Sequence, residues 1–150
     1  MKDEYAKITI GHTKPDDMSD ILDLLRECEL PSEGLAAHQA TTLLARSNDE
    51  IVGCAALELH QEYALLRSVA VKQSHRNQSA GQLLVSASLK LASRHSIIMV
   101  YLLTETAEAF FEKFGFKPVP RSDVPGKVQR SVEFTSLCPE TATVMAISLG

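Results

Sequence analysis

The sequence predicts one α+β domain that spans all 150 residues. Three observations support this fold class: three successive strand-like runs, a strand followed by a polar loop and a helix, and a continuous apolar run of strand length. The length is ordinary for one compact domain, and a hydrophobic content of 45% is enough to form a buried core. Two separate domains would be difficult to build from this chain.

Composition and charge exclude several classes of protein. The formal net charge of -4 gives no general electrostatic reason to bind nucleic acid or an anionic membrane. The three cysteines are far apart and lack metal-ligand spacing, so we expect neither a disulfide framework nor a metal site. No segment approaches the roughly 20 apolar residues of a membrane span, and the N-terminus does not resemble a signal peptide. The sequence therefore predicts a cytoplasmic protein.

The spacing of apolar residues distinguishes strands from helices along the chain. Strands are expected at residues 5–9, 41–47, 51–60, 64–71, 97–103, 116 onward and 141–149, and helices at 15–30, 32–38, 81–93 and 106–114. Short polar turns separate the three strands between 41 and 71, as in an antiparallel meander. The run at 97–103 is apolar throughout, which is typical of a central strand buried on both faces.

The segment from residue 64 to residue 93 carries the first indication of chemistry. An apolar strand leads through a polar loop into a helix that begins near Gly81. The start of a helix offers unpaired backbone N–H groups and the positive end of its dipole. This order of elements predicts a binding site for phosphate groups.

Two motifs in the chain resemble the GNAT superfamily of acetyltransferases. Residues 68–71 followed by 76–84 resemble its pyrophosphate motif, R/Q-x-x-G-x-G/A, and residues 111–116 resemble its Y-E-K-x-G-F signature. The order of elements agrees with the family over nearly the whole chain. Ser79 and Asn77 stand where the family usually has glycine, and a Cβ at position 79 restricts the loop.

The resemblance implies a three-layer α/β/α fold with a mixed, centrally splayed sheet, in which residues 1–150 form a single N-acetyltransferase domain. It also implies acetyl-CoA as co-substrate, with the backbone N–H of Val69 polarising the thioester carbonyl as an oxyanion donor. The coenzyme-binding positions are Val69, Ala70, Val71, Arg76, Asn77, Gln78, Ser79, Ala80, Gly81, Gln82, Phe110 and Phe111.

The groups that would transfer protons are less clearly marked. The family usually has a tyrosine as general acid at the position of Phe111, and Tyr101 either replaces it or is an ordinary buried strand residue. Glu58 is a candidate base because it lies on one face of a strand with His60, which is the alternative. Both side chains also fit a solvated strand end.

Arg67 stands two residues before Val69 in an otherwise apolar strand. An unpaired charge there would be costly, so the guanidinium needs a carboxylate partner or an anionic ligand. We keep two interpretations open: Arg67 binds an anionic group of the substrate, or it pairs with Glu58 or Glu62 across the hairpin.

Residues 66–68, 101–111 and 133–139 resemble a GNAT subgroup associated with arsenic-resistance gene clusters. This narrower resemblance implies an acceptor that is a small primary amine, such as an anionic amino-acid-like compound. Cys138 fits either a ligand for trivalent arsenic or a packed structural cysteine before Pro139. We assign no metal site to it.

Three functions remain at this point. The first is an N-acetyltransferase that acts on a small-molecule amine as a monomer or homodimer, without nucleic acid or membrane partners. The second is an acyl-CoA binding module without activity, because Ser79 replaces glycine and Phe111 replaces tyrosine. The third is a structural or partner-binding domain that has lost coenzyme binding.

Overall fold

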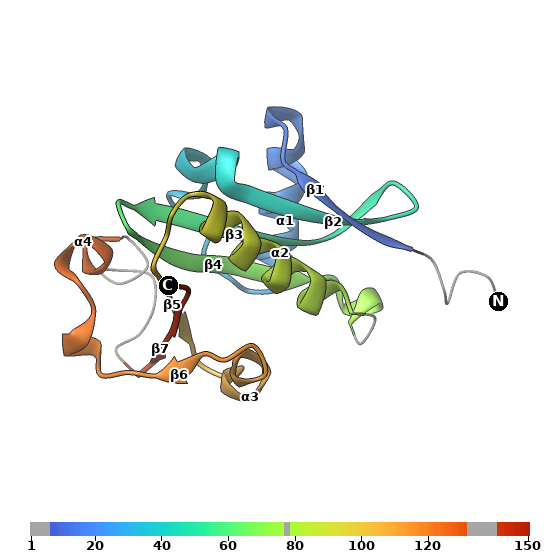
Figure 1. The fold of residues 1–150 in the computed structure, drawn as a ribbon. Helices are drawn as coiled ribbons and strands as arrows, with labels where there is room; N and C mark the ends of the chain where they lie inside the picture. The colour runs from blue at the N-terminus through green and yellow to red at the C-terminus, as the bar shows by residue number, and fades with distance from the viewer. Residues whose placement is uncertain (1–6, 77–78, 132–140) are drawn as a thin grey trace. The chain divides into compact units, whose positions relative to one another are not determined.

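The computed structural model describes residues 7–76, 79–131 and 141–150 (Figure 1). The strands are β1 (Ile8–His12), β2 (Thr42–Ser47), β3 (Glu50–His60), β4 (Tyr63–Val71), β5 (Met99–Thr104), β6 (Lys117–Pro118) and β7 (Thr143–Ser148). The α-helices are α1 (Met18–Glu27), α2 (Ala80–Arg94), α3 (Glu108–Glu112) and α4 (Gly126–Gln129). Short 3₁₀ turns lie at Pro15–Asp17, Leu35–Thr41, Gln73–His75 and Arg121–Asp123.

The seven strands form a mixed sheet in the order β1-β2-β3-β4-β5-β7-β6. The β1/β2, β2/β3, β5/β7 and β6/β7 pairs are antiparallel, and the β4/β5 pair is parallel. The parallel register joins Tyr63, Ala64 and Leu65 to β5 and ends at Leu65. The predicted α+β class with a mixed sheet is therefore confirmed.

The chain packs as two compact units. The first contains the described residues up to Ala56 together with Ser68–Ser88, and the second contains Leu57–Arg67 and Leu89–Gly150. β3, β4 and α2 each contribute residues to both units. The single domain at residues 1–150 stays a prediction, and each unit is described by itself below.

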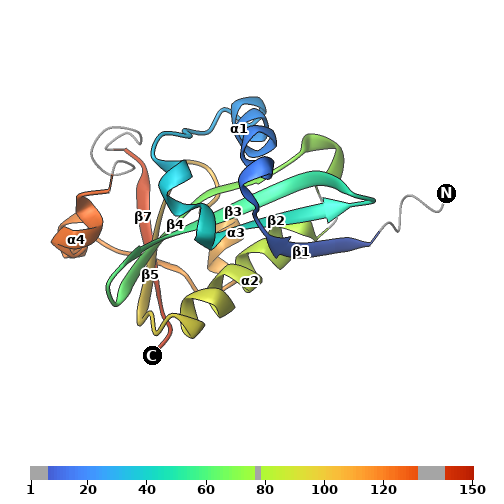
Figure 2. The same ribbon diagram turned by 90° about the horizontal axis from the view of Figure 1, so that it is seen from above.

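Helix α1 covers one face of the strands in the first unit because its apolar residues form one stripe. Ile21, Leu24 and Leu25 are buried and pack with Leu44 of β2 and Cys54 of β3. Alternate strand residues point to opposite faces of a sheet, so the neighbours of Leu44 and Cys54 face away from α1. Figure 2 shows α1 and the start of α2 on opposite sides of β2 and β3.

Gly53 allows α2 to lie close to the sheet in the first unit. A Cβ built on Gly53 would lie 2.9 Å from Cδ1 of Leu84 and 3.0 Å from the carbonyl oxygen of Ala70. Leu84 is a buried residue of α2, and Ala70 belongs to β4. The absence of a side chain at Gly53 therefore fixes how the helix packs against the strand that leads into it.

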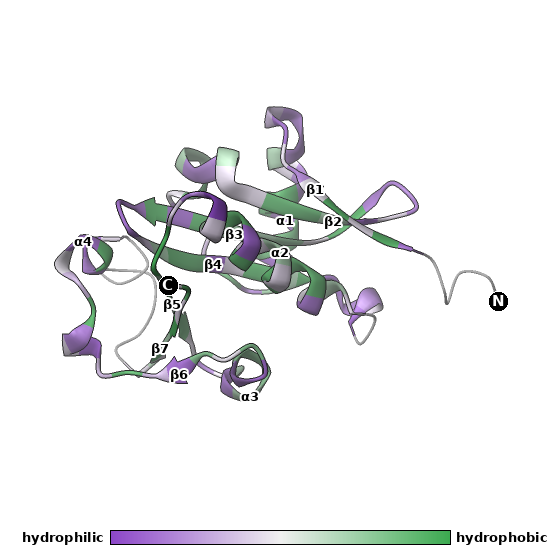
Figure 3. Ribbon diagram, in the orientation of Figure 1, coloured by the Kyte–Doolittle hydropathy of each residue, from purple (hydrophilic) through white to green (hydrophobic). Residues whose placement is uncertain are grey.

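The second unit has an apolar cluster of its own. Leu65 and Tyr101, which are paired between β4 and β5, pack with Val124, Val128 and residues of β7. Figure 3 shows hydrophobic residues along the central strands, as expected for strands covered on both faces. The apolar run predicted as a buried central strand is β5.

The boundaries of several elements differ from the sequence prediction. The first strand is Ile8–His12 rather than 5–9, because Gly11 and His12 pair with β2; residues 1–6 lie outside the description. The helix predicted at 106–114 is only Glu108–Glu112. Thr104 accepts a hydrogen bond from the Ala107 N–H at 3.0 Å, which holds the chain in a turn before that helix.

Two further segments were assigned incorrectly. The helix expected at 32–38 is a 3₁₀ turn displaced to Leu35–Thr41, after Gly34 at φ 77°. α4 was not predicted, because a four-residue helix is too short to show a periodic apolar pattern. The conformation of these two segments depends on local turns and caps.

Candidate functional site

The candidate phosphate-binding site is the β4–α2 loop, residues 72–79, in the first unit. β4 ends at Val71, a 3₁₀ turn covers Gln73–His75, and α2 starts at Ala80. The predicted binding positions Asn77 and Gln78 lie outside the described residues. The strand, polar loop and helix expected from the sequence are therefore present in that order.

The start of α2 suits a phosphate group. The first N–H groups of a helix have no partner within the helix, and α2 has no acidic residue in its first turn to compete for them. Ala80 is buried and Gly81 is half-buried, while Gln82 is exposed. These backbone groups fit the pyrophosphate of a coenzyme.

Ser79, which stands where the family motif usually has glycine, adopts a left-handed conformation. Its φ is 72°, and its carbonyl oxygen accepts the Leu83 N–H at 2.9 Å. Serine thus enters helix α2 in a backbone geometry that costs an L-residue roughly 1–2 kcal/mol. Serine therefore carries backbone strain at this position that glycine would not.

Arg76 ties the loop to the end of β4. Its Nε donates to the Val71 carbonyl oxygen at 3.1 Å, and its Nη2 lies 3.6 Å from Sγ of Cys28. The thiol of Cys28 also lies 3.7 Å from the Val71 carbonyl oxygen. The side chain of Arg76 therefore positions the loop at the point where the strand ends.

A backbone irregularity lies inside β4. Ser68 has a φ of 59°, and its carbonyl oxygen accepts a hydrogen bond from the buried thiol of Cys54 at 3.2 Å. Burial raises the pKa of Cys54 to about 12, so this thiol stays protonated and able to donate. A left-handed residue within a strand disturbs the regular pleat and changes the direction of the next peptide group, that of Val69.

A separate group of candidate residues lies in the second unit and consists of Glu58, His60 and Arg67, called here the Glu58 cluster. Arg67 Nη1 donates to Glu58 Oε2 at 2.8 Å, and His60 Nε2 lies 3.1 Å from Glu58 Oε1. The Arg67 side chain is 0% exposed and that of Glu58 is 3% exposed. Of the two interpretations of Arg67, pairing with Glu58 is the one present here.

Glu62, the other partner considered for Arg67, instead accepts a hydrogen bond from Lys127 at 2.9 Å. That hydrogen bond lowers the pKa of Glu62. Tyr101 is 6% exposed, and burial raises its pKa. A raised pKa makes Tyr101 a weaker acid.

The two aromatic residues of α3 pack on each other and on the two phenylalanines that follow the helix. Phe110 lies 5.1 Å from Phe111 and 5.3 Å from Phe114, measured between ring centroids, and Phe111 lies 5.8 Å from Phe116. Phe111 is buried and Phe110 is half-buried. The phenyl ring at position 111 provides packing but no ionisable hydroxyl group.

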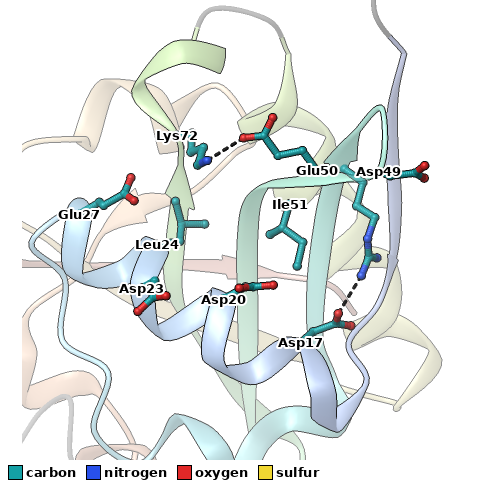
Figure 4. Close-up of a pocket in the computed structure, with 10 residues that line it drawn as sticks. Asp17, Asp20, Asp23, Leu24, Glu27, Asp49, Glu50, Ile51 and Lys72 are labelled. Carbon is teal, nitrogen blue, oxygen red and sulfur yellow. Dashed lines mark hydrogen bonds and ion pairs between the residues drawn. The ribbon is translucent and has the colours of Figure 1, made fainter.

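An acidic cavity of about 400 Å³ lies beside α1 in the first unit (Figure 4). Six carboxylates and two cations line it, together with Leu24 and Ile51. Both cations are already paired: Lys72 binds Glu50 at 2.6 Å and Arg46 binds Asp17 at 3.0 Å. The excess of negative charge makes this cavity unsuitable for a phosphate group.

The described residues form neither a metal site nor a membrane-spanning helix. Within residues 7–76, 79–131 and 141–150, no group of three or more histidine, cysteine or acidic side chains could hold a metal ion. No helix in this part of the chain is long and apolar enough to cross a membrane. The segment at 133–139 and Cys138 lie outside the described residues.

Comparison with known families shows to which family the chain belongs. Residues 38–118, more than half of the chain, match the acetyltransferase (GNAT) domain family. The chain belongs to the GNAT acetyltransferases. The co-substrate of this family is acetyl-CoA, and the matched region contains the whole β4–α2 loop and the Glu58 cluster.

Two similar proteins have names that agree with this family. An uncharacterized N-acetyltransferase of Chlorobaculum tepidum is 28% identical over 99 residues, which cover 65% of this chain and 63% of the relative. An amino-acid acetyltransferase of Pasteurella multocida is 30% identical over 86 residues, covering 56% of this chain and 20% of the relative. The chain thus spans less than two thirds of the length of these relatives.

Solved structures share the fold. N-acetylglutamate synthase from Neisseria gonorrhoeae, in complex with coenzyme A and N-acetyl-glutamate, gives a TM-score of 0.83 at 18% identity over 97% of this chain and 36% of that protein. A Mycobacterium tuberculosis protein in complex with CoA gives 0.79 at 22% identity, covering 95% of this chain and 99% of that protein. These similarities confirm the predicted GNAT fold.

The sequence analysis assigned no role to three residues of the first unit, namely Gly53, Cys54 and Ser68. Gly53 and Cys54 act through partners on β4 or α2 that are distant in sequence. Serine rarely takes a left-handed conformation, so no pattern marks Ser68. A glycine inside a strand run is the one available signal, because it often indicates a close backbone approach.

Proposed function

We propose that this chain is an N-acetyltransferase that moves the acetyl group of acetyl-CoA to the primary amine of a small molecule. The observation that carries the proposal is the segment from β4 to α2. In this segment, a strand with an irregular peptide leads through a polar loop to the N-terminus of a helix that has no acidic residue in its first turn. The segment lies within the region that matches the GNAT family.

The coenzyme is bound mainly by backbone groups in this proposal. The pantetheine arm follows Val69, Ala70 and Val71, and the pyrophosphate rests on the loop and the first turn of α2. The positive φ of Ser68 supports the role of the Val69 N–H as oxyanion donor, because it redirects the peptide between these residues. Phe110 and Phe111 remain coenzyme-binding positions in this proposal.

The acceptor in this proposal is an anionic amino-acid-like compound. The names of two similar proteins support it, namely the Pasteurella amino-acid acetyltransferase and the Neisseria N-acetylglutamate synthase. The resemblance to the subgroup linked to arsenic resistance adds phosphinothricin-like and arsenical amino acids to the candidates. Arg67 contacts the acceptor anion only if it shares its guanidinium between Glu58 and the substrate.

Two experiments test the proposal. Acetyl-CoA should raise the melting temperature, because a ligand that binds only the folded state stabilises it. Thiol release should then depend on an added amine, measured over a panel of acidic, neutral and basic amino acids. Absence of binding by calorimetry would contradict any coenzyme function.

A second candidate function, acyl-CoA binding without turnover, is favoured by one observation. Phe111 occupies the position of the usual tyrosine acid and is packed among other aromatic rings. Binding of acetyl-CoA without thiol release for any amine would select this function. Phe111→Tyr then offers a direct check, because it restores a proton donor at the same position.

A further inference from the structure

A buried thiol of β3 contacts the irregular part of β4. Cys54 Sγ donates a hydrogen bond to the Ser68 carbonyl oxygen at 3.2 Å. The backbone of Ala70 also forms a hydrogen bond with this sulfur. All three residues belong to the first unit, as does Val69. One side chain of β3 therefore contacts the β4 backbone immediately before and immediately after residue 69.

The surroundings of Cys54 exclude water from this contact. The residue is 0% exposed and belongs to the apolar cluster that contains Leu24, Leu25 and Leu44. A buried hydrogen bond has no competing water, and its loss leaves a polar backbone group without that partner. Burial also raises the pKa of Cys54 to about 12, so the thiol keeps the hydrogen that it donates.

The contact fixes the direction of the Val69 N–H through the geometry of one peptide group. The Ser68 carbonyl and the Val69 N–H belong to the same peptide, and the described residues contain no cis peptide bond. A trans peptide is planar, so its C=O and N–H bonds point in opposite directions. Since the carbonyl points to Cys54, the Val69 N–H points away from it. The φ of 59° at Ser68 is unfavourable for an L-residue and persists only where neighbouring groups stabilise it.

We propose that Cys54 is a positioning residue for acetyl transfer, because its thiol holds the peptide between Ser68 and Val69 in the orientation in which the Val69 N–H meets the thioester carbonyl of acetyl-CoA. This inference rests on the proposed function. When the acceptor nitrogen bonds to the acetyl carbon, the carbonyl oxygen gains negative charge. An N–H that already points to this oxygen stabilises the charge without reorganisation. Cys54 touches no reacting atom and acts only through the peptide.

Two substitutions separate the hydrogen bond from the packing of the sulfur. Cys54→Ser and Cys54→Ala introduce side chains of similar volume, but only serine keeps a hydrogen to donate. Both variants lose the packing of the sulfur, and burial of the serine hydroxyl gives no advantage in stability. A role limited to packing therefore predicts that the two variants behave alike. A positioning role predicts that serine stays close to the wild type.

The first test uses the protein without ligands. Residual dipolar couplings measure the direction of the Val69 N–H, which should be the same in the wild type and Cys54→Ser but different in Cys54→Ala. The order parameter of this amide should fall from about 0.85 to about 0.6 in Cys54→Ala. Cys28→Ala is the control, because Cys28 Sγ lies 3.7 Å from the Val71 carbonyl oxygen, and Val69 should keep its direction there.

The second test uses acetyl-CoA labelled with ¹³C at the acetyl carbonyl, without an amine. An N–H that donates to the thioester carbonyl lowers its stretching frequency in the infrared spectrum. The bound label should absorb at a lower frequency in the wild type and Cys54→Ser than in Cys54→Ala. Free coenzyme A lacks this carbonyl, so its Kd should agree within about twofold among the three proteins.

The third test measures turnover. Loss of one oxyanion donor lowers kcat by about 100- to 1,000-fold in known enzymes. Cys54→Ala misdirects the donor without removing it, so kcat should fall by about tenfold, while Cys54→Ser should keep about half of the wild-type value or more.

The outcomes separate this inference from the proposed function. If the wild type binds acetyl-CoA but acetylates no amine, the proposed function fails, and the N–H direction and the infrared frequency still test the contact. If the wild type is active, equal kcat values in the wild type and Cys54→Ala, or in the two variants, overturn the role of Cys54 alone. Should Cys54→Ala fail to fold, the wild type still provides a test. An order parameter below about 0.6 at its Val69 amide would contradict a peptide held by the thiol.

Discussion

The β4–α2 loop of the first unit and the Glu58 cluster of the second unit are built in different ways. The loop offers backbone N–H groups at the start of α2, and its side chains mainly hold it in place, as Arg76 does on Val71. The Glu58 cluster consists of side chains alone, linked by hydrogen bonds of 2.8 and 3.1 Å. A backbone site tolerates sequence change more readily than a side-chain site, because most residue types present the same N–H group.

This difference explains why Ser79 can replace glycine without loss of the fold. The backbone at position 79 keeps φ near 72°, so the helix still starts at Ala80. No comparable replacement is open to Arg67, which supplies a planar, permanently charged donor in a buried position. Substitutions in the two regions should therefore change the free energy of unfolding by different amounts.

The largest effect is expected from Arg67→Met, which leaves the Glu58 charge buried without its cation. Such a change costs about 3–5 kcal/mol of unfolding free energy, measured by urea denaturation. The exposed pair of Arg26 and Asp23 is the control, and Arg26→Met should cost less than about 1 kcal/mol. Equal losses for both variants would show that burial of the Glu58 cluster has no energetic consequence.

The double variant Glu58→Leu/Arg67→Met sharpens the same comparison. Removing both charges should recover most of the stability lost in Arg67→Met, because apolar residues of similar volume can replace a buried ion pair. If Arg67 also binds the acceptor anion, as in the proposed function, activity toward anionic amines should remain low. A stable double variant with full activity would limit the pair to a structural role.

The next effect concerns the packing of α2. Gly53→Ala introduces a Cβ within 3.0 Å of the Ala70 carbonyl oxygen and should cost about 1–3 kcal/mol. Gly11→Ala is the matched control, since a Cβ there meets no atom within 4 Å. Thermal unfolding with and without acetyl-CoA measures both changes. An unchanged Tm for Gly53→Ala would contradict the close approach of helix and strand.

A smaller effect depends on pH and on Cys54 beneath the irregular peptide of β4. Burial raises the pKa of Cys54 to about 12, from 9.0 for an ordinary thiol, so the unfolded chain loses this proton first as pH rises. Its contribution to stability is complete below pH 9 and is lost progressively between pH 9 and 12. At pH 10 the loss is about 1.4 kcal/mol relative to pH 8.

Cys54→Ala should lack this loss between pH 8 and pH 10, although it is less stable at both. Chemical denaturation of the two proteins at both pH values measures the difference. Parallel losses in the wild type and the variant would show that Cys54 is not protected from ionisation.

The smallest effect is expected from Ser79→Gly. Relief of the left-handed strain, offset by the greater freedom of glycine in the unfolded chain, leaves a gain of up to about 1 kcal/mol. Acetyl-CoA should also bind more tightly, because the loop can approach phosphate more closely. Ser96→Gly is the control: Ser96 has a φ of 61°, so it should gain stability without a change in coenzyme affinity.

The sequence predicted the elements on either side of the β4–α2 loop better than the contacts within the Glu58 cluster. The run ending at Val71, the polar loop and the helix near Gly81 follow from local periodicity and from a motif, so β4, the loop and α2 were placed correctly. The strand period also placed Glu58 and His60 on one face of β3. Which partner Arg67 takes, and how Cys54 contacts Ser68, depend on pairing between strands, which local patterns do not specify.

The most direct test of the account is a titration with acetyl-CoA followed through the backbone amide signals of the protein. We expect the largest shifts at the amides of Val69, Ala70, Val71, Gly81 and Gln82, with small shifts at Asp20 and Glu27 in the acidic cavity. Gly81→Val should abolish these changes while the fold is retained, because its bulk obstructs the approach of the pyrophosphate. Shifts confined to the acidic cavity, or equal binding by Gly81→Val, would contradict a coenzyme site on the backbone of the β4–α2 loop.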